Sequence, residues 1–125
     1  MNILQLRFVS IGLFFLLLLP SGLWLSHSGK PYHLILFNIH KLIGFGLLVF
    51  LAINVYRVNQ VTPLSPLQLT ACLITGLFFI AAIVTGGLVS IPRAMPEVVS
   101  LSHRLLPYLT MLSAIISIYL LLKSR

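Results

Sequence analysis

The stretch Leu67–Ile91, LQLTACLITGLFFIAAIVTGGLVSI, contains no charged residue and lies inside a charge-free run from Val58 to Pro92. A helix needs about 20 consecutive apolar residues to cross the hydrocarbon core of a bilayer. This stretch therefore predicts a transmembrane helix. Three further segments meet the same criterion, so we expect helices at about residues 3–25, 31–56, 67–91 and 96–122.

The composition supports a membrane protein. Of the 125 residues, 59% are hydrophobic, and the charged residues are eight Lys or Arg and one acid, Glu97. A soluble domain carries charge on about a quarter of its residues, which excludes that class here. The net charge of +7 does not indicate nucleic-acid binding, because the cations stand singly between apolar stretches, as membrane anchors do. The one cysteine, Cys72, excludes disulfide and dithiol chemistry within the chain.

The connections between the apolar segments are short and rich in proline, glycine and serine. We therefore predict an all-α fold, an integral membrane four-helix bundle that forms a single domain over residues 1–125. The first segment also resembles a signal peptide, but its apolar character continues after Pro20, so we expect it to stay as a membrane helix.

The sequence contains an internal repeat. Residues 40–45 read HKLIGF and residues 103–108 read HRLLPY, an offset of 63. The preceding segments contain Ser21-Gly22-Leu23 and Gly86-Gly87-Leu88, at an offset of 65. These matches predict two copies of a transmembrane hairpin, as in transporters with parallel repeats.

Two histidines fall inside apolar segments, at matching positions of the repeat. His40 and His103 follow Pro31 and Pro96 by nine and seven residues, so we expect them at similar depth from one membrane face. Ionisable residues at membrane depth generally mark function. Two histidines are too few for a zinc site, but they complete the coordination of a haem iron, because the porphyrin supplies four nitrogens.

The neighbouring residues suit a haem. Gly44 lies one helical turn after His40, and glycine lets a flat macrocycle approach the backbone. Gly22 and Gly87 offer further room on the other two helices. Lys41 and Arg104 directly follow the histidines and are candidate partners for the two haem propionates.

These motifs resemble the four-helix membrane cytochromes b, a group that includes haem-b subunits of respiratory dehydrogenases and hydrogenases. The resemblance rests on His40-Lys41 with Gly44, on His103-Arg104 and on the small residues near the ends of helices one and three. It implies haem b, electron transport, and quinone or redox partner subunits. Family members commonly hold two haems. Here the other halves of the second and fourth segments contain no histidine that could ligate a second haem, and their polar residues are Asn54 and Ser117. We therefore expect one haem b, in an electron carrier or an oxidoreductase subunit.

An alternative function is a cofactor-free membrane scaffold or assembly subunit. In that case His40 and His103 are interfacial residues that hydrogen-bond to neighbouring helices. Lys41 and Arg104 would then extend to the lipid head groups. We interpret His27 as a loop residue and His33 as a solvated interfacial residue, with ligation by His33 in place of His40 as the second option.

The basic residues divide four to four between the two expected sides of the membrane. If Lys41 and Arg104 are set aside as cofactor partners, the balance becomes four against two. The positive-inside rule then predicts cytoplasmic termini, in a bacterial inner membrane, with the two histidines near the external face.

Overall fold

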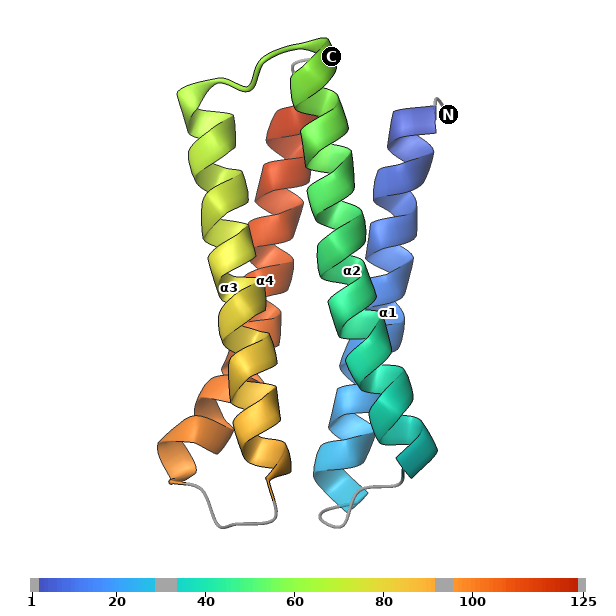
Figure 1. Cartoon of the computed structure of the whole chain (residues 1–125), viewed down its shortest axis with the longest axis vertical. Coiled ribbons are helices and arrows are strands. Elements are labelled where there is room, and N and C mark those ends of the chain that lie inside the picture. Colours follow the sequence, from blue (N-terminus) through green and yellow to red (C-terminus); the bar gives the residue numbers. More distant parts are fainter. Residues whose placement is uncertain (1–2, 29–33, 92–95, 124–125) are drawn as a thin grey trace. The chain divides into compact units, whose positions relative to one another are not determined.

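The computed structural model describes residues 3–28, 34–91 and 96–123. It contains four α-helices, α1 (Ile3–Ser28), α2 (Leu34–Val61), α3 (Pro66–Ser90) and α4 (Glu97–Lys123), shown in Figure 1. All four are long and apolar enough to span a membrane, and no strand occurs in the described ranges. The predicted all-α fold with four transmembrane helices is confirmed, and the chain is a multi-pass integral membrane protein.

The predicted helix boundaries hold best for the second half of the chain. Helices α3 and α4 begin and end within one residue of the expected positions. Helix α1 instead continues to Ser28, so His27 lies in its last turn and not in a loop. Helix α2 continues to Val61, five residues beyond the expected end, because Arg57 and the polar residues after it do not oppose helix formation. The expected start at Pro31 lies outside the described residues.

The chain divides into two compact units, Met1–Ala52 and Ile53–Arg125. The first unit contains α1 and most of α2, and the buried side chains among its described residues are apolar. These are Phe8, Ile11, Phe15, Leu25, Leu47 and Leu51. The second unit contains the end of α2 together with α3 and α4. Its buried side chains include five polar ones, namely Asn54, Gln68, Thr75, Thr110 and Ser117.

Helix α3 begins at a well-formed N-terminal cap. The Ser65 hydroxyl accepts a hydrogen bond from the Gln68 backbone N–H at 3.2 Å, and the Gln68 side-chain oxygen accepts one from the Ser65 N–H at 2.9 Å. Pro66 occupies the first helical position, where its missing N–H costs nothing. This reciprocal capping box satisfies two donors that a helix start otherwise leaves unpaired.

Polar side chains fix the antiparallel register of α3 and α4. The Gln68 side-chain amide donates to the Leu120 carbonyl at 3.0 Å, and the hydroxyls of Thr75 and Ser113 lie 2.6 Å apart. Thr85, ten residues after Thr75 on α3, forms a hydrogen bond with His103. His103 lies ten residues before Ser113 on α4, as an antiparallel pair requires. Hydrogen bonds therefore tie the two helices together at three levels.

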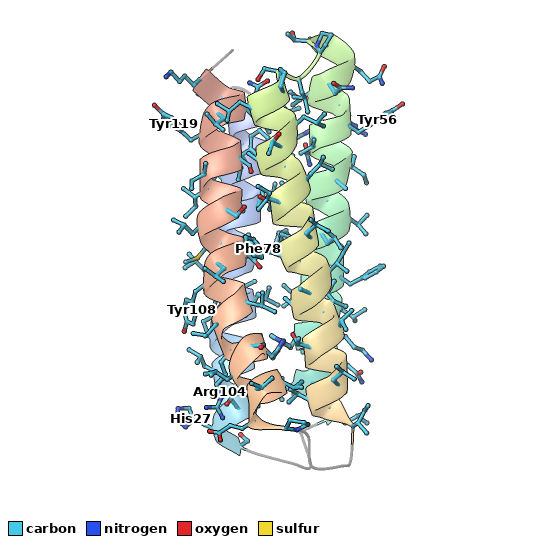
Figure 2. All side chains as sticks on the ribbon, turned by 90° about the vertical axis from the view of Figure 1, so that its left-hand side faces the viewer. His27, Tyr56, Phe78, Arg104, Tyr108 and Tyr119 are labelled. Carbon is cyan, nitrogen blue, oxygen red and sulfur yellow. The ribbon has the colours of Figure 1, made fainter. Side chains whose placement is uncertain are left out.

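The outward surface of the helices is apolar, as lipid contact requires. Large exposed side chains include Leu16, Leu42, Leu77 and Ile115. Tyr108 and Tyr119 project outward from α4 in Figure 2, and Tyr119 is 61% exposed. Helix α4 also contains Pro107, which removes the usual backbone donor for the His103 carbonyl.

Candidate functional site

His40 lies against α1 within the first unit. It is the seventh residue of α2 and is half-buried. Its Nδ1 is 2.9 Å from the Ser21 hydroxyl oxygen. The Cε1 edge of the ring is 2.9 Å from the point where a Cβ on Gly22 would lie. The imidazole is therefore held by a hydroxyl and by direct approach to the backbone of the neighbouring helix.

His103 has the same environment within the second unit. It is the seventh residue of α4 and is half-buried. Its Nδ1 is 3.1 Å from the Thr85 hydroxyl oxygen, and its Cε1 is 2.8 Å from the Cβ position of Gly86. Both helix pairs thus build one and the same arrangement of hydroxyl, glycine and imidazole.

The structure corrects the register of the repeat in α1 and α3 by one residue. Ser21 and Gly22 correspond to Thr85 and Gly86, at an offset of 64, because these residues hold the equivalent histidine. Gly87 is exposed and has no atom within 4 Å of its Cβ position. The sequence alignment of the two glycine motifs matched the wrong glycine because the second motif contains two in succession.

Glycine at both contact positions lets the imidazole lie where it does, because a Cβ there would require the ring to shift. Side-chain Cβ atoms do not come within 3.0 Å of another residue's heavy atoms, and a Cβ on Gly22 or Gly86 would do so against the imidazole. With glycine, the flat ring packs on the helix backbone, in the way that small residues generally allow close approach in membranes. Gly22, which the sequence analysis predicted as a haem-packing position, lies directly against the His40 ring.

Gly44 packs against the first helix. Its Cβ position lies 3.5 Å from a Leu18 methyl group, which is ordinary van der Waals contact. A small side chain at position 44 therefore fits within the first unit without strain.

The two cations that follow the histidines are both exposed. The Lys41 ammonium lies 5.2 Å from the centroid of the Phe37 ring, a cation–π contact one helical turn earlier. Arg104 extends outward from α4 in Figure 2. Both side chains have long flexible stems, so their charged ends can serve an anion near the helix start or the lipid head groups.

A cluster of hydroxyl side chains also lies between α3 and α4 in the second unit, separate from the His103 site. The sequence analysis did not predict it. The Thr75 hydroxyl lies 2.6 Å from that of Ser113 and 2.9 Å from that of Ser117. Ser117 is thus part of the α3–α4 packing.

Within residues 3–28, 34–91 and 96–123, no three His, Cys, Asp or Glu side chains are grouped as metal ligands. In each of the two histidine sites described above, the metal-ligating side chain is one imidazole, beside a hydroxyl and a glycine. Such a site suits a metal that arrives with most of its coordination already filled.

No family model, curated protein or solved structure matches this chain. The chemistry of the two histidine sites is therefore the observation that bears most directly on function.

Proposed function

We propose that this chain is an integral membrane b-type cytochrome that carries electrons through one haem b, with His40 and His103 as its axial ligands. The observation that supports the proposal is the repeated construction of the two histidine sites. In each unit, the seventh residue of a membrane helix is an imidazole whose Nδ1 contacts a hydroxyl and whose edge contacts a glycine. Two equivalent imidazoles are the protein ligands that would hold a haem iron.

The donor set fits haem in chemical terms. Imidazole is a common axial ligand of haem iron, and the four porphyrin nitrogens complete the coordination that two histidines leave open. When bound, the haem would supply reversible one-electron transfer. The chain itself would orient the two imidazoles and keep them in an environment from which the membrane excludes most water.

Lys41 and Arg104 are the proposed partners of the haem propionates. Each directly follows its histidine and has an exposed side chain. The chain contains one acidic residue, Glu97, so these cations have little competition from its own carboxylates. Hydrogen bonds between a cation and a carboxylate are stronger than neutral ones, most of all for the two-pronged guanidinium of arginine. Gly44 and Gly87 would supply packing surface for the macrocycle.

The charge distribution supports an orientation. Four membrane crossings place the start of α1 and the end of α4 on the same side, together with Arg7, Arg57 and Lys123. We assign that side to the cytoplasm of a bacterial inner membrane, following the positive-inside rule. The histidines then lie toward the external face, where a quinol or a redox partner subunit would exchange electrons with the haem.

One observation favours a second candidate function. Each imidazole already forms a hydrogen bond to a hydroxyl on the neighbouring helix of its own unit. Such bonds link membrane helices, and a cofactor-free scaffold or assembly subunit would need no more from these histidines.

The two functions differ in a visible spectrum. We would purify the full chain from haem-replete cells and record oxidised and dithionite-reduced spectra of wild type, His40→Ala and His103→Ala. A b-type cytochrome gives sharp reduced α and β bands in wild type that both variants lose. A colourless wild-type protein with normal yield would refute the cytochrome and favour the scaffold.

A further inference from the structure

The hydroxyls of Ser21 and Thr85 contact the two histidines in equivalent ways, and the proposed function gives them no role. Each lies on the helix that precedes a histidine and contacts the Nδ1 atom of that histidine. Each also lies within hydrogen-bond distance of a backbone carbonyl of its own helix. The number of protons available to these contacts decides which nitrogen of each imidazole is protonated.

Ser21 has one hydroxyl proton and two close neighbours. Its oxygen is 2.8 Å from the Leu18 carbonyl oxygen and 2.9 Å from His40 Nδ1. A carbonyl oxygen only accepts hydrogen bonds, so the hydroxyl proton must lie toward Leu18 for that contact to be a bond. The Ser21 oxygen then accepts, and His40 Nδ1 must donate.

Thr85 repeats this arrangement. Its hydroxyl oxygen is 2.8 Å from the Ala81 carbonyl oxygen, 3.1 Å from that of Ala82 and 3.1 Å from His103 Nδ1. Both carbonyls can only accept, so the hydroxyl proton is used within α3. His103 Nδ1 is therefore also the donor in its contact with Thr85.

The opposite assignment is unfavourable. If the hydroxyl donated to an unprotonated Nδ1, its oxygen would face a carbonyl oxygen at 2.8 Å with no proton between them. Two acceptors at that distance repel each other, and a buried polar contact left unsatisfied costs about 1–3 kcal/mol. For the contacts of these two hydroxyls, donation by Nδ1 is the one assignment that makes each of them a hydrogen bond.

We infer that Ser21 and Thr85 are positioning residues that hold His40 and His103 as the Nδ1–H tautomer, so that the lone pair of each neutral imidazole is on Nε2. The assignment of tautomers stands on the hydrogen bonds alone. Its consequence for metal binding rests on the proposed function, because Nε2 is then the atom that would bind the haem iron. A fixed Nδ1–H bond is how proteins generally orient histidine ligands.

The tautomer is measurable without haem. We would express the chain without haem supply in a background carrying His27→Gln and His33→Gln, label histidine with ¹⁵N, and record ¹⁵N spectra in lipid bilayers above pH 8. The expected spectrum shows both remaining histidines with a protonated Nδ1 and an unprotonated Nε2. A majority of the Nε2–H tautomer at either histidine would overturn the inference.

Matched variants separate tautomer control from simple packing. Ser21→Ala and Thr85→Ala should each release the tautomer of the histidine they contact and leave the other unchanged. Ser21→Thr and Thr85→Ser exchange the hydroxyl residues of the two units and should retain the Nδ1–H form. Retention of that form in both alanine variants would contradict the positioning role.

Haem binding provides the second readout. If wild type binds haem, Ser21→Ala and Thr85→Ala should weaken its affinity by about 10- to 100-fold, the usual effect of losing such a partner. The exchange variants should bind as wild type does, and equal affinity in the alanine variants would refute the role in ligation. If wild type binds no haem, the proposed function fails, while the ¹⁵N spectra still decide the tautomer assignment.

Discussion

The Cε1 atom of His103 lies 2.8 Å from the point where a Cβ on Gly86 would stand. Gly86→Ala therefore forces the imidazole away from α3 and strains its bond to Thr85. We expect a loss of about 1–3 kcal/mol in the free energy of unfolding, the usual cost of overpacking. Gly76→Ala is the control on the same helix, because nothing lies within 4 Å of its Cβ position. Unfolding by SDS titration, followed by circular dichroism, compares the two. Equal stability of the two variants would contradict the contact.

Gly22 makes the equivalent contact with His40 in the first unit. Gly22→Ala should destabilise the chain by a similar amount, whereas Gly12→Ala, in open space on the same helix, should be neutral or slightly stabilising. The same titration measures both variants. If Gly22→Ala left the free energy of unfolding unchanged while Gly86→Ala lowered it, the two histidine sites would not be equivalent.

Thr75 links α3 to two hydroxyls of α4 and is 1% exposed. Thr75→Val keeps the shape of the side chain but removes both interhelical bonds. Hydrogen bonds between membrane helices contribute about 0.6 kcal/mol each on average, so we expect a loss of about 1 kcal/mol in the free energy of unfolding. Thr70→Val is the control, since the exposed Thr70 hydroxyl bonds to the Pro66 carbonyl of its own helix. If Thr75→Val left the free energy of unfolding unchanged, the hydroxyl cluster would contribute nothing to stability.

Lys41 and Arg104 allow the propionate role to be distinguished from contact with head groups. If each binds a propionate, Lys41→Gln and Arg104→Gln should each weaken haem affinity by about tenfold or more, since a hydrogen bond to a charged group contributes about 1.5–3 kcal/mol. Lys123→Gln is a matched control, because Lys123 lies 5.9 Å from the Tyr119 ring centroid, much as Lys41 lies over Phe37. Haem titration of the three variants measures the difference. Equal affinity in all of them would assign Lys41 and Arg104 to the head groups.

The helices were predictable because their signal is local. A run of apolar residues such as Leu67–Ile91 is long enough for a membrane span whatever it packs against. The end of α2 was less predictable, since polar residues at a membrane surface neither require a helix nor prevent one. His27 was placed wrongly for the same reason, because the helix continues through the polar residues that follow Leu25.

The two histidines were also found from the sequence, because an imidazole within an apolar segment is conspicuous. Their partners were not. Hydroxyl residues are frequent in membrane helices, and the choice of Thr85 depends on which residues of α3 face α4, a matter of packing. Aligning the repeat on a hydroxyl residue followed by glycine, at positions 21–22 and 85–86, would have identified Thr85 and Gly86 in place of Gly87.

The central claim is that His40 and His103 together hold one haem, and haem content per chain tests it most directly. We would measure haem by the pyridine haemochrome method in purified wild type and in alanine variants of His27, His33, His40 and His103. The account predicts one haem per chain in wild type, His27→Ala and His33→Ala, and almost none in His40→Ala and His103→Ala. Absence of haem from wild type, or its full retention in either of the last two variants, would contradict the account.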